Sequence, residues 1–224
     1  MRFKSVLILL FVTLISGFMI STRSTAVGQE EGKAAASNKL AVKNKVTNET
    51  KVAGRTMVEW QADLSSSNEI IRLRAVKSLG PFGTDAITIL NDCLSDESDA
   101  VQYWAADHLG TIGAEVAESK NRAGVIESLR RIIKSSPDKA VSMAAAYAHF
   151  KIDSSAEHLE LIIRRLSHRE RGMACSAAEF LGKIGPPAKA ALPELQSKYK
   201  DHGDYHVRGA SLNAIRKIKG EPVR

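Results

Sequence analysis

Residues 101–113 read VQYWAADHLGTIG, and the same arrangement of apolar and small residues occurs at four other places in the chain. Residues 71–83 read IRLRAVKSLGPFG, and related segments begin at Val141, at Met173 and, in a degraded form, at Val207. The first residues of successive segments lie 30, 40, 32 and 34 positions apart. A period of this length is typical of solenoids built from stacked helix pairs. The sequence therefore predicts repeated helix pairs rather than one globular core.

Each repeated segment has the periodicity of a helix with one buried side. Ile71, Ala75, Leu79 and Phe82 fall within about 80 degrees of one another on a helical wheel, and the other segments keep apolar residues at most of these positions. Alanines in the middle of the segments are small enough for neighbouring helices to approach closely. We therefore interpret the repeated segment as the second helix of each pair.

A first helix is predicted before each repeated segment. These first helices are expected over residues 56–64, 85–94, 122–134, 155–166 and 188–199. The positions of Gly80 and Gly83 are predicted to end the second helices, because glycine tolerates a left-handed backbone. Ser154 and Ser167, each followed three residues later by glutamate, are predicted to form capping boxes. Residues 114–121 have no counterpart in the other repeats. They are expected to form either a longer loop or an N-terminal extension of the helix predicted over residues 122–134.

The first 26 residues have the composition of an export signal. Arg2 and Lys4 precede an apolar run over residues 6–20, and residues 24–26, Ser-Thr-Ala, match a cleavage site. We expect cleavage, because the run is short for a membrane-spanning helix, which needs ~20 residues; the alternative is a retained N-terminal membrane anchor. Residues 27–55 contain no aromatic residue and are predicted to be a disordered linker. The solenoid is then residues 56–224 of a periplasmic or extracellular protein.

Charge and cysteine content exclude two further features. The formal net charge of the chain is +7, but residues 56–224 contribute only +1 of it. Nucleic-acid binding needs clustered positive charge, so we expect no nucleic-acid partner. Cys93 and Cys175 lie two repeats apart, and distant repeats of a solenoid do not touch. We therefore expect no disulfide, since bridged Cα atoms lie within ~7 Å of each other.

The repeated segments resemble a known repeat family. AADHLGTIG at residues 105–113 and AAEFLGKIG at residues 177–185 resemble HEAT repeats, most closely the short, alanine-rich type named after phycobilin lyases. The resemblance covers residues 56–224. It implies an all-α, armadillo-like fold, a right-handed α-solenoid of about five HEAT-type helix pairs. It also implies that the second helices line the concave face. This repeat type occurs in scaffolds, adaptors and a few enzymes.

The sequence contains few residues arranged for chemistry. His202, Asp204 and His206 have a spacing that suits a metal ion. We favour a polar loop in which Asp204 caps the next helix, because no neighbouring group is evident to hold the imidazoles. No G-x-S-x-G, phosphate-loop or Cys-x-x-Cys motif occurs in the sequence. We therefore predict no catalytic residue, no cofactor and no metal.

A binding surface is predicted on the second helices, opposite their buried side. It consists of Tyr103, Trp104, Asp107, Tyr147 and Glu179. Aromatic side chains with a few charges are frequent in interface hot spots. The alternative is that the aromatic residues pack against the next repeat. That alternative is favoured for Trp104 and stays open for Tyr147.

These features together predict an exported, non-enzymatic HEAT-repeat scaffold. Its partner would be a protein or an extended peptide bound along the concave face. The resemblance implies one alternative, a lyase or isomerase that acts on a bilin, or an accessory subunit of such an enzyme. An export signal argues against it, because the pigment-bearing substrates of that family are cytoplasmic. Another alternative is a module of an envelope assembly with residues 27–55 as its tether. Membrane contact is expected only if the signal segment is retained.

Overall fold

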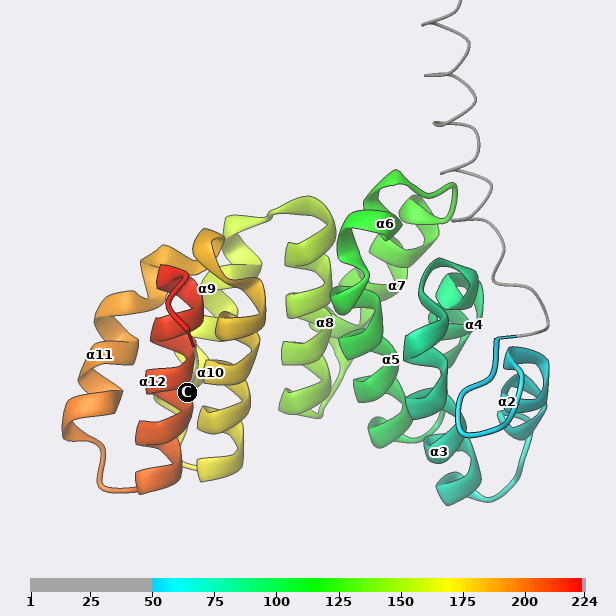
Figure 1. The fold of residues 1–224 in the computed structure, drawn as a ribbon, viewed down its shortest axis with the longest axis horizontal. Coiled ribbons are helices and arrows are strands. Elements are labelled where there is room, and N and C mark those ends of the chain that lie inside the picture. The colour runs from blue at the N-terminus through cyan, green and yellow to red at the C-terminus, as the bar shows by residue number, and fades with distance from the viewer. Residues whose placement is uncertain (1–49, 223–224) are drawn as a thin grey trace, which may run out of the picture. The chain divides into compact units, whose positions relative to one another are not determined.

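The computed structural model describes residues 50–222 of the chain. Within that range the secondary structure is helical, apart from one isolated bridge between Val52 and Arg55. The expected all-α fold is therefore confirmed (Figure 1). None of the helices in this range is both long enough and apolar enough to cross a bilayer. The predicted signal segment, residues 1–26, and residues 27–49 of the predicted linker lie outside the described residues.

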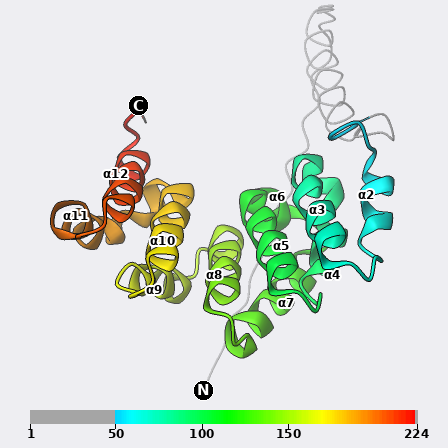
Figure 2. The same ribbon diagram turned by 90° about the horizontal axis from the view of Figure 1, so that it is seen from below.

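The described residues form five helix pairs in the predicted order. The first helices of the pairs, the A helices, are α2 (Met57–Asp63), α4 (Ile87–Cys93), α7 (Arg122–Ser135), α9 (Ala156–Arg165) and α11 (Leu192–Asp201). The second helices, the B helices, are α3 (Glu69–Leu79), α5 (Asp99–Thr111), α8 (Lys139–Asp153), α10 (Arg171–Ile184) and α12 (Tyr205–Lys219). Figure 2 shows two layers, in which the B helices follow the inner side of the arc formed by these pairs. This placement agrees with the expected arrangement.

Three short helices complete the stack. The 3-10 helices η1 (Gly80–Ala86) and η2 (Pro186–Ala191) lead into α4 and α11. The extra residues form a helix of their own, α6 (Gly113–Glu118), which packs against α8. A Cβ atom at Gly113 would lie 2.6 Å from the Cβ atom of Lys151 in α8. Glycine at this position therefore allows α6 to begin directly against α8.

The folded part begins before the predicted boundary at Thr56. The indole Nε1 of Trp60 donates a hydrogen bond to the carbonyl oxygen of Val52 at 3.0 Å. The guanidinium of Arg55 lies 4.1 Å from the centroid of the Trp60 ring and pairs with Asp63 at 2.6 Å. Among the described residues no earlier repeat covers α2, so these contacts shield Trp60, which is 4% exposed. Residues 52–55 therefore belong to the solenoid rather than to the linker.

Side chains just before the B helices satisfy their free backbone N–H groups. The residues that do so are Asn68 for α3, Ser98 for α5, Asp138 for α8 and Asp204 for α12. Both predicted capping boxes are wrong. Ser154 has a left-handed backbone, with φ of 53°, and ends α8, whereas the Ser167 hydroxyl donates a hydrogen bond to Glu194. The capping box that forms joins Thr56 and Glu59 at the start of α2. The Ser-x-x-Glu spacing caps a helix only where free N–H groups follow it.

The two predicted glycine positions have different roles. Gly185, with φ of 75°, ends α10 as expected. The earlier position ends the helix in the first repeat, where Gly80 is the C-cap residue of α3, but Gly110 and Gly182 lie inside α5 and α10. A Cβ atom at Gly110 would lie 2.4 Å from the ring of Tyr147 in α8, and one at Gly182 would lie 3.2 Å from the Cα atom of Ala214 in α12. Glycine at the earlier position therefore allows the next B helix to approach closely.

The B helices α8 and α10 are the exception to this close approach. Phe150 occupies in α8 the position that Gly110 occupies in α5, nine residues after the first residue of the repeated segment. Phe150 is 7% exposed. Contact between α8 and α10 is less extensive than contact between α5 and α8 or between α10 and α12. Figure 1 shows this wider seam between α8 and α10.

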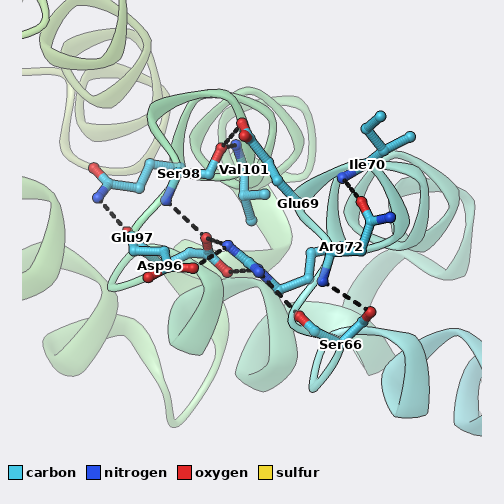
Figure 3. A network of polar contacts seen from close by, with 10 residues as sticks. Ser66, Glu69, Ile70, Arg72, Asp96, Glu97, Ser98 and Val101 are labelled. Carbon is cyan, nitrogen blue, oxygen red and sulfur yellow. Dashed lines mark hydrogen bonds and ion pairs between the residues drawn. The ribbon is translucent and has the colours of Figure 1, made fainter.

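A buried arginine joins the first two pairs. The guanidinium of Arg72 in α3 donates to both oxygens of Asp96, with Nε 2.9 Å from Oδ2, and it also lies 2.9 Å from Glu97 (Figure 3). Its remaining nitrogen donates to the carbonyl oxygen of Ser66 at 2.9 Å. The side chain of Arg72 is only 7% exposed, so most of its donors are satisfied within the protein. This network holds the loop before α3 against the loop before α5.

Candidate functional site

The predicted surface of the central repeats is closed by stacked aromatic rings. Tyr147 of α8 stacks on Phe180 of α10, with ring centroids 4.7 Å apart and planes 22° apart. Tyr103 of α5 lies 6.0 Å from the same Phe180 ring. Tyr147 is 2% exposed, and burial raises its pKa to about 12. Its prediction as a partner-binding residue is therefore wrong, because its ring fills the seam between α8 and α10.

Asp107 is also enclosed rather than presented to a partner. Its side chain is 8% exposed and forms an ion pair with Lys183 of α10 at 2.5 Å. The ammonium group of Lys183 lies 5.4 Å from the Phe180 ring and 5.8 Å from the Tyr147 ring. The predicted role of Asp107 as an accessible recognition charge is wrong. The ion pair instead connects α5 to α10 across the seam.

Tyr103 and Trp104 are half-buried at the edge of this cluster. Their rings meet edge to face, with centroids 5.8 Å apart. The ammonium group of Lys77 lies over the Trp104 ring at 4.5 Å, and the His108 ring lies 5.9 Å from it. Burial, and next the charge of Asp107, raises the pKa of Tyr103 to about 12. Both aromatic residues pack between repeats and leave only part of their surface accessible.

An open groove lies further along the B-helix layer, between α10 and α12. Its first hollow has a volume of about 530 Å³ and is lined by Arg171, Gly172, Cys175, Glu179, Tyr205, His206, Gly209, Ala210 and Asn213. Tyr205 is 67% exposed, and its ring lies 3.9 Å from the His206 ring. Of the predicted surface residues, Glu179 lines this hollow. A partner could therefore reach the predicted surface at Glu179, between α10 and α12, rather than at the buried residues of the central repeats.

A second hollow extends the groove toward the C-terminal ends of α10 and α12. It measures about 290 Å³ and shares Glu179, Ala210 and Asn213 with the first. It adds Lys183 and Lys217 to the lining. The two hollows together, called the α10–α12 groove below, contain more basic than acidic side chains. Electrostatic complementarity favours an acidic ligand in such a groove.

The candidate metal ligands are engaged in the start of α12. The Asp204 carboxylate accepts hydrogen bonds from the backbone N–H groups of His206, at 2.8 Å, and Val207, at 3.4 Å. Nδ1 of His202 accepts a hydrogen bond from the backbone N–H of Asp204 at 3.1 Å. Within residues 50–222 no group of three or more histidine, cysteine or acidic side chains has an arrangement suited to a metal ion. Asp204 therefore caps the N-terminus of α12, as the favoured interpretation of this loop predicted.

Sequence reasoning missed three residues of this surface, namely Phe180, Lys183 and Tyr205. Phe180 carries a usable signal, because it is a large apolar residue at a position where other repeats have Ser78, His108, Ala148 and Ala214. An unusually large side chain on a helix of a regular repeat indicates a seam that needs filling. Nothing in the sequence distinguishes Lys183 from the other lysines.

The two cysteines, both described, are free, as expected; Cys93 is buried and Cys175 is half-buried.

Comparisons with known proteins identify the repeat type. Residues 59–149 match the family model for HEAT repeats. An engineered protein of known structure is similar, with a TM-score of 0.46 and 22% identity over 75% of this chain and 80% of that chain. The complex of CpcE and CpcF of phycocyanin lyase from Nostoc sp. PCC7120 has a TM-score of 0.37 and 18% identity over 88% of this chain and 91% of that chain. The comparison with curated proteins found no match. Residues 59–149, which span the first three helix pairs, are therefore HEAT repeats, and the same alternation of helices continues through α12.

Proposed function

We propose that this chain is an exported, non-enzymatic scaffold that holds an extended, acidic segment of a partner protein in the α10–α12 groove. The observation that carries the proposal is the open, predominantly basic groove between two B helices. Arg171, Lys183 and Lys217 line it, against Glu179 as its acidic residue. Lys183 also pairs with Asp107, and Arg171 lies 3.7 Å from Asp204, so Lys217 is the lining cation that has no ion pair within residues 50–222. Tyr205 adds an exposed aromatic ring at the end of the groove. Aromatic and arginine side chains are enriched among the residues that dominate binding energy.

The chemistry of the groove supports binding rather than catalysis. Cys175 is the nucleophilic side chain that lines it. Burial, and next the charge of Glu179, raises the pKa of the Cys175 thiol. A raised pKa keeps the thiol protonated at neutral pH, whereas a nucleophilic cysteine needs the thiolate. The groove therefore favours a ligand that is held but not transformed.

Selection from a displayed peptide library tests the groove. The full chain should enrich acidic peptides, and reversing two charges, Arg171→Glu with Lys217→Glu, should weaken their binding by about tenfold or more. The matched control reverses Arg169 and Lys189, which are exposed and lie outside the groove. Enrichment of neutral or basic peptides, or equal loss in both double variants, would contradict the assignment. Circular dichroism checks that both variants keep their helices.

The proposed export depends on the composition of residues 1–26. Mass spectrometry of the protein purified from its native host should find a mature N-terminus near Val27. An intact Met1 would contradict cleavage and favour the N-terminal anchor. This experiment is independent of peptide binding, so the location and the groove are tested separately.

A further inference from the structure

A third hollow lies among the helices α7, α8 and α9, which form no part of the α10–α12 groove. Its volume is about 500 Å³, and it is lined by Arg130, Ile133, Lys134, His149, Asp153, Ser155, Glu157 and His158. The wide seam after α8 leaves α7 and α9, the A helices on either side of it, without extensive contact. The hollow therefore lies where the regular stacking is interrupted.

Two buried imidazoles line this hollow. His149 is 1% exposed and His158 is 9% exposed, and their rings are 4.1 Å apart. Within the described residues, neither ring nitrogen of His149 nor Nδ1 of His158 has a hydrogen-bond partner. Buried polar side chains nearly always have a partner in the protein or in a bound molecule. These nitrogen atoms are therefore available to form a hydrogen bond with water or with a polar ligand.

The positive charges around the hollow favour an anion. Arg130 and Lys134 are exposed and lie one turn apart on α7. The N-terminus of α9 opens at the same hollow, and Ser155, its N-cap residue, makes no side-chain hydrogen bond to the first turn. Free N–H groups and the helix dipole at such an end attract oxyanions. The guanidinium of Arg130, the ammonium group of Lys134 and the N-terminus of α9 therefore all lie around this hollow.

The acidic residues of the hollow do not favour a metal ion. Asp153 is paired with Arg122 at 2.5 Å, so its charge is already compensated. Glu157, in the first turn of α9, is the other carboxylate of the lining. Within the described residues no three candidate ligands are grouped for a metal. The donors available are therefore mostly those of an anion site.

We propose that this hollow binds an oxyanion of the phosphate class, either inorganic phosphate or a phosphate monoester. Arg130 and Lys134 supply positive charge, and the first N–H groups of α9 and the imidazole N–H groups of His149 and His158 donate hydrogen bonds to its oxygens. Burial lowers the pKa of both histidines, so each ring is neutral at pH 7 and carries one N–H donor. A bound anion favours the protonated imidazole, so binding should raise the pKa of both rings.

Nuclear magnetic resonance of the histidine ring protons tests the site in the full chain. Titration with inorganic phosphate should shift the signals of His149 and His158 in a saturable manner. The rings of His168 and His202, which line neither this hollow nor the α10–α12 groove, should not respond in the same way. Titration with glycerol phosphate distinguishes the two ligand forms: tighter binding of the ester identifies a monoester site, and tighter binding of the free ion identifies inorganic phosphate. Absence of saturable shifts with both ligands would overturn the proposal.

Two arginine variants make the test specific. Arg130→Gln should weaken phosphate binding by about tenfold, as expected for a lost hydrogen bond to a charged group. Arg131→Gln is the matched control, because Arg131 follows directly on α7 but bonds to Ser95 and does not line the hollow. Equal losses in both variants would indicate general charge attraction and overturn the proposal. A saturable response of the two rings to zinc, without one to phosphate, would also overturn it in favour of a metal site.

Discussion

Single small residues decide how closely the B helices approach one another. Ala105 and Ala106 of α5 are completely buried, and Gly110 leaves room for the Tyr147 ring of the next B helix. Phe150 at the equivalent position of α8 is followed by the wide seam. Packed interiors respond to differences of one or a few carbon atoms, so one residue can change the spacing of a whole repeat. The residue at this one position therefore influences how closely two successive B helices pack.

Replacing Gly110 with alanine should lower the free energy of unfolding by roughly 1–3 kcal/mol, because it overpacks the contact between α5 and α8. The added Cβ atom would lie 2.4 Å from a ring carbon of Tyr147 and 3.0 Å from the Cα atom of Ala148. Urea denaturation measures the change. Gly124→Ala in α7 is the control, because its Cβ atom would meet nothing within 4 Å. That variant should gain about 0.5–1 kcal/mol from helix propensity, and a similar effect of both substitutions would contradict the packing role of Gly110.

Among the elements, α8 is the most enclosed helix. All of its residues from 141 to 150 are buried, and it contacts α5, α6, α7 and α9. A helix at the surface needs only one apolar stripe, whereas a helix enclosed on most sides is apolar nearly all round. The buried polar residues in this stretch are Ser142 and His149, and the ring of His149 lies against the ring of His158 from α9. The seam between α8 and α9 therefore contains groups that titrate in mild acid.

Acidification should destabilise this seam. Burial lowers the pKa of His149 from 6.5 to about 4, with smaller contributions from the charges of His158 and Arg130. Below pH ~6.5 the unfolded chain therefore binds a proton that the folded chain does not, and the free energy of unfolding falls as the pH falls toward ~4. The slope is at most ~1.4 kcal/mol per pH unit for each histidine.

Urea denaturation at several pH values between neutral and mildly acidic measures this slope, in a buffer without phosphate. His149→Leu should remove part of it, since leucine does not titrate. His206→Leu is the control, because His206 is exposed. If the free energy of unfolding of His149→Leu depends on pH as strongly as that of the original protein, the two buried imidazoles are not the cause of this dependence.

For residues 50–222 as a whole, the seam between α8 and α10 separates three helix pairs from two. In a solenoid each repeat is stabilised by contacts with its neighbours, so a thin interface limits the cooperativity of the stack. Across this seam the stack of Tyr147 on Phe180 and the ion pair of Asp107 with Lys183 connect the B helices. We expect the coupling between the two groups of pairs to depend on these contacts.

Replacing Phe180 with alanine should cost about 3–5 kcal/mol, the range for a buried aromatic residue. Amide hydrogen exchange should then show α10 and α12 losing protection before α3 and α5, because the coupling across the seam is reduced. Leu109→Ala, at a fully buried position of α5, is the control and should lower protection in the first group of pairs. Uniform loss of protection in the Phe180 variant would show that the stack does not couple the two groups.

The predicted binding residues show which part of the site depended on tertiary structure. The helical wheel placed Glu179 on the side of its helix opposite the buried stripe, and Glu179 lines the α10–α12 groove. The same wheel placed Tyr147 on that side, but the ring is buried. A wheel describes one helix and contains no distance to the next. Burial at such positions depends on how far apart two helices of different repeats stand.

The repeat period and the apolar stripes determined by themselves that the chain forms stacked helix pairs, because both signals come from residues close together in sequence. The tertiary structure alone decided which part of the B-helix layer is open and which is closed. Phe180 closes the central seam through rings that come from three different repeats. These contacts join residues tens of positions apart, so they arise only when the repeats have stacked.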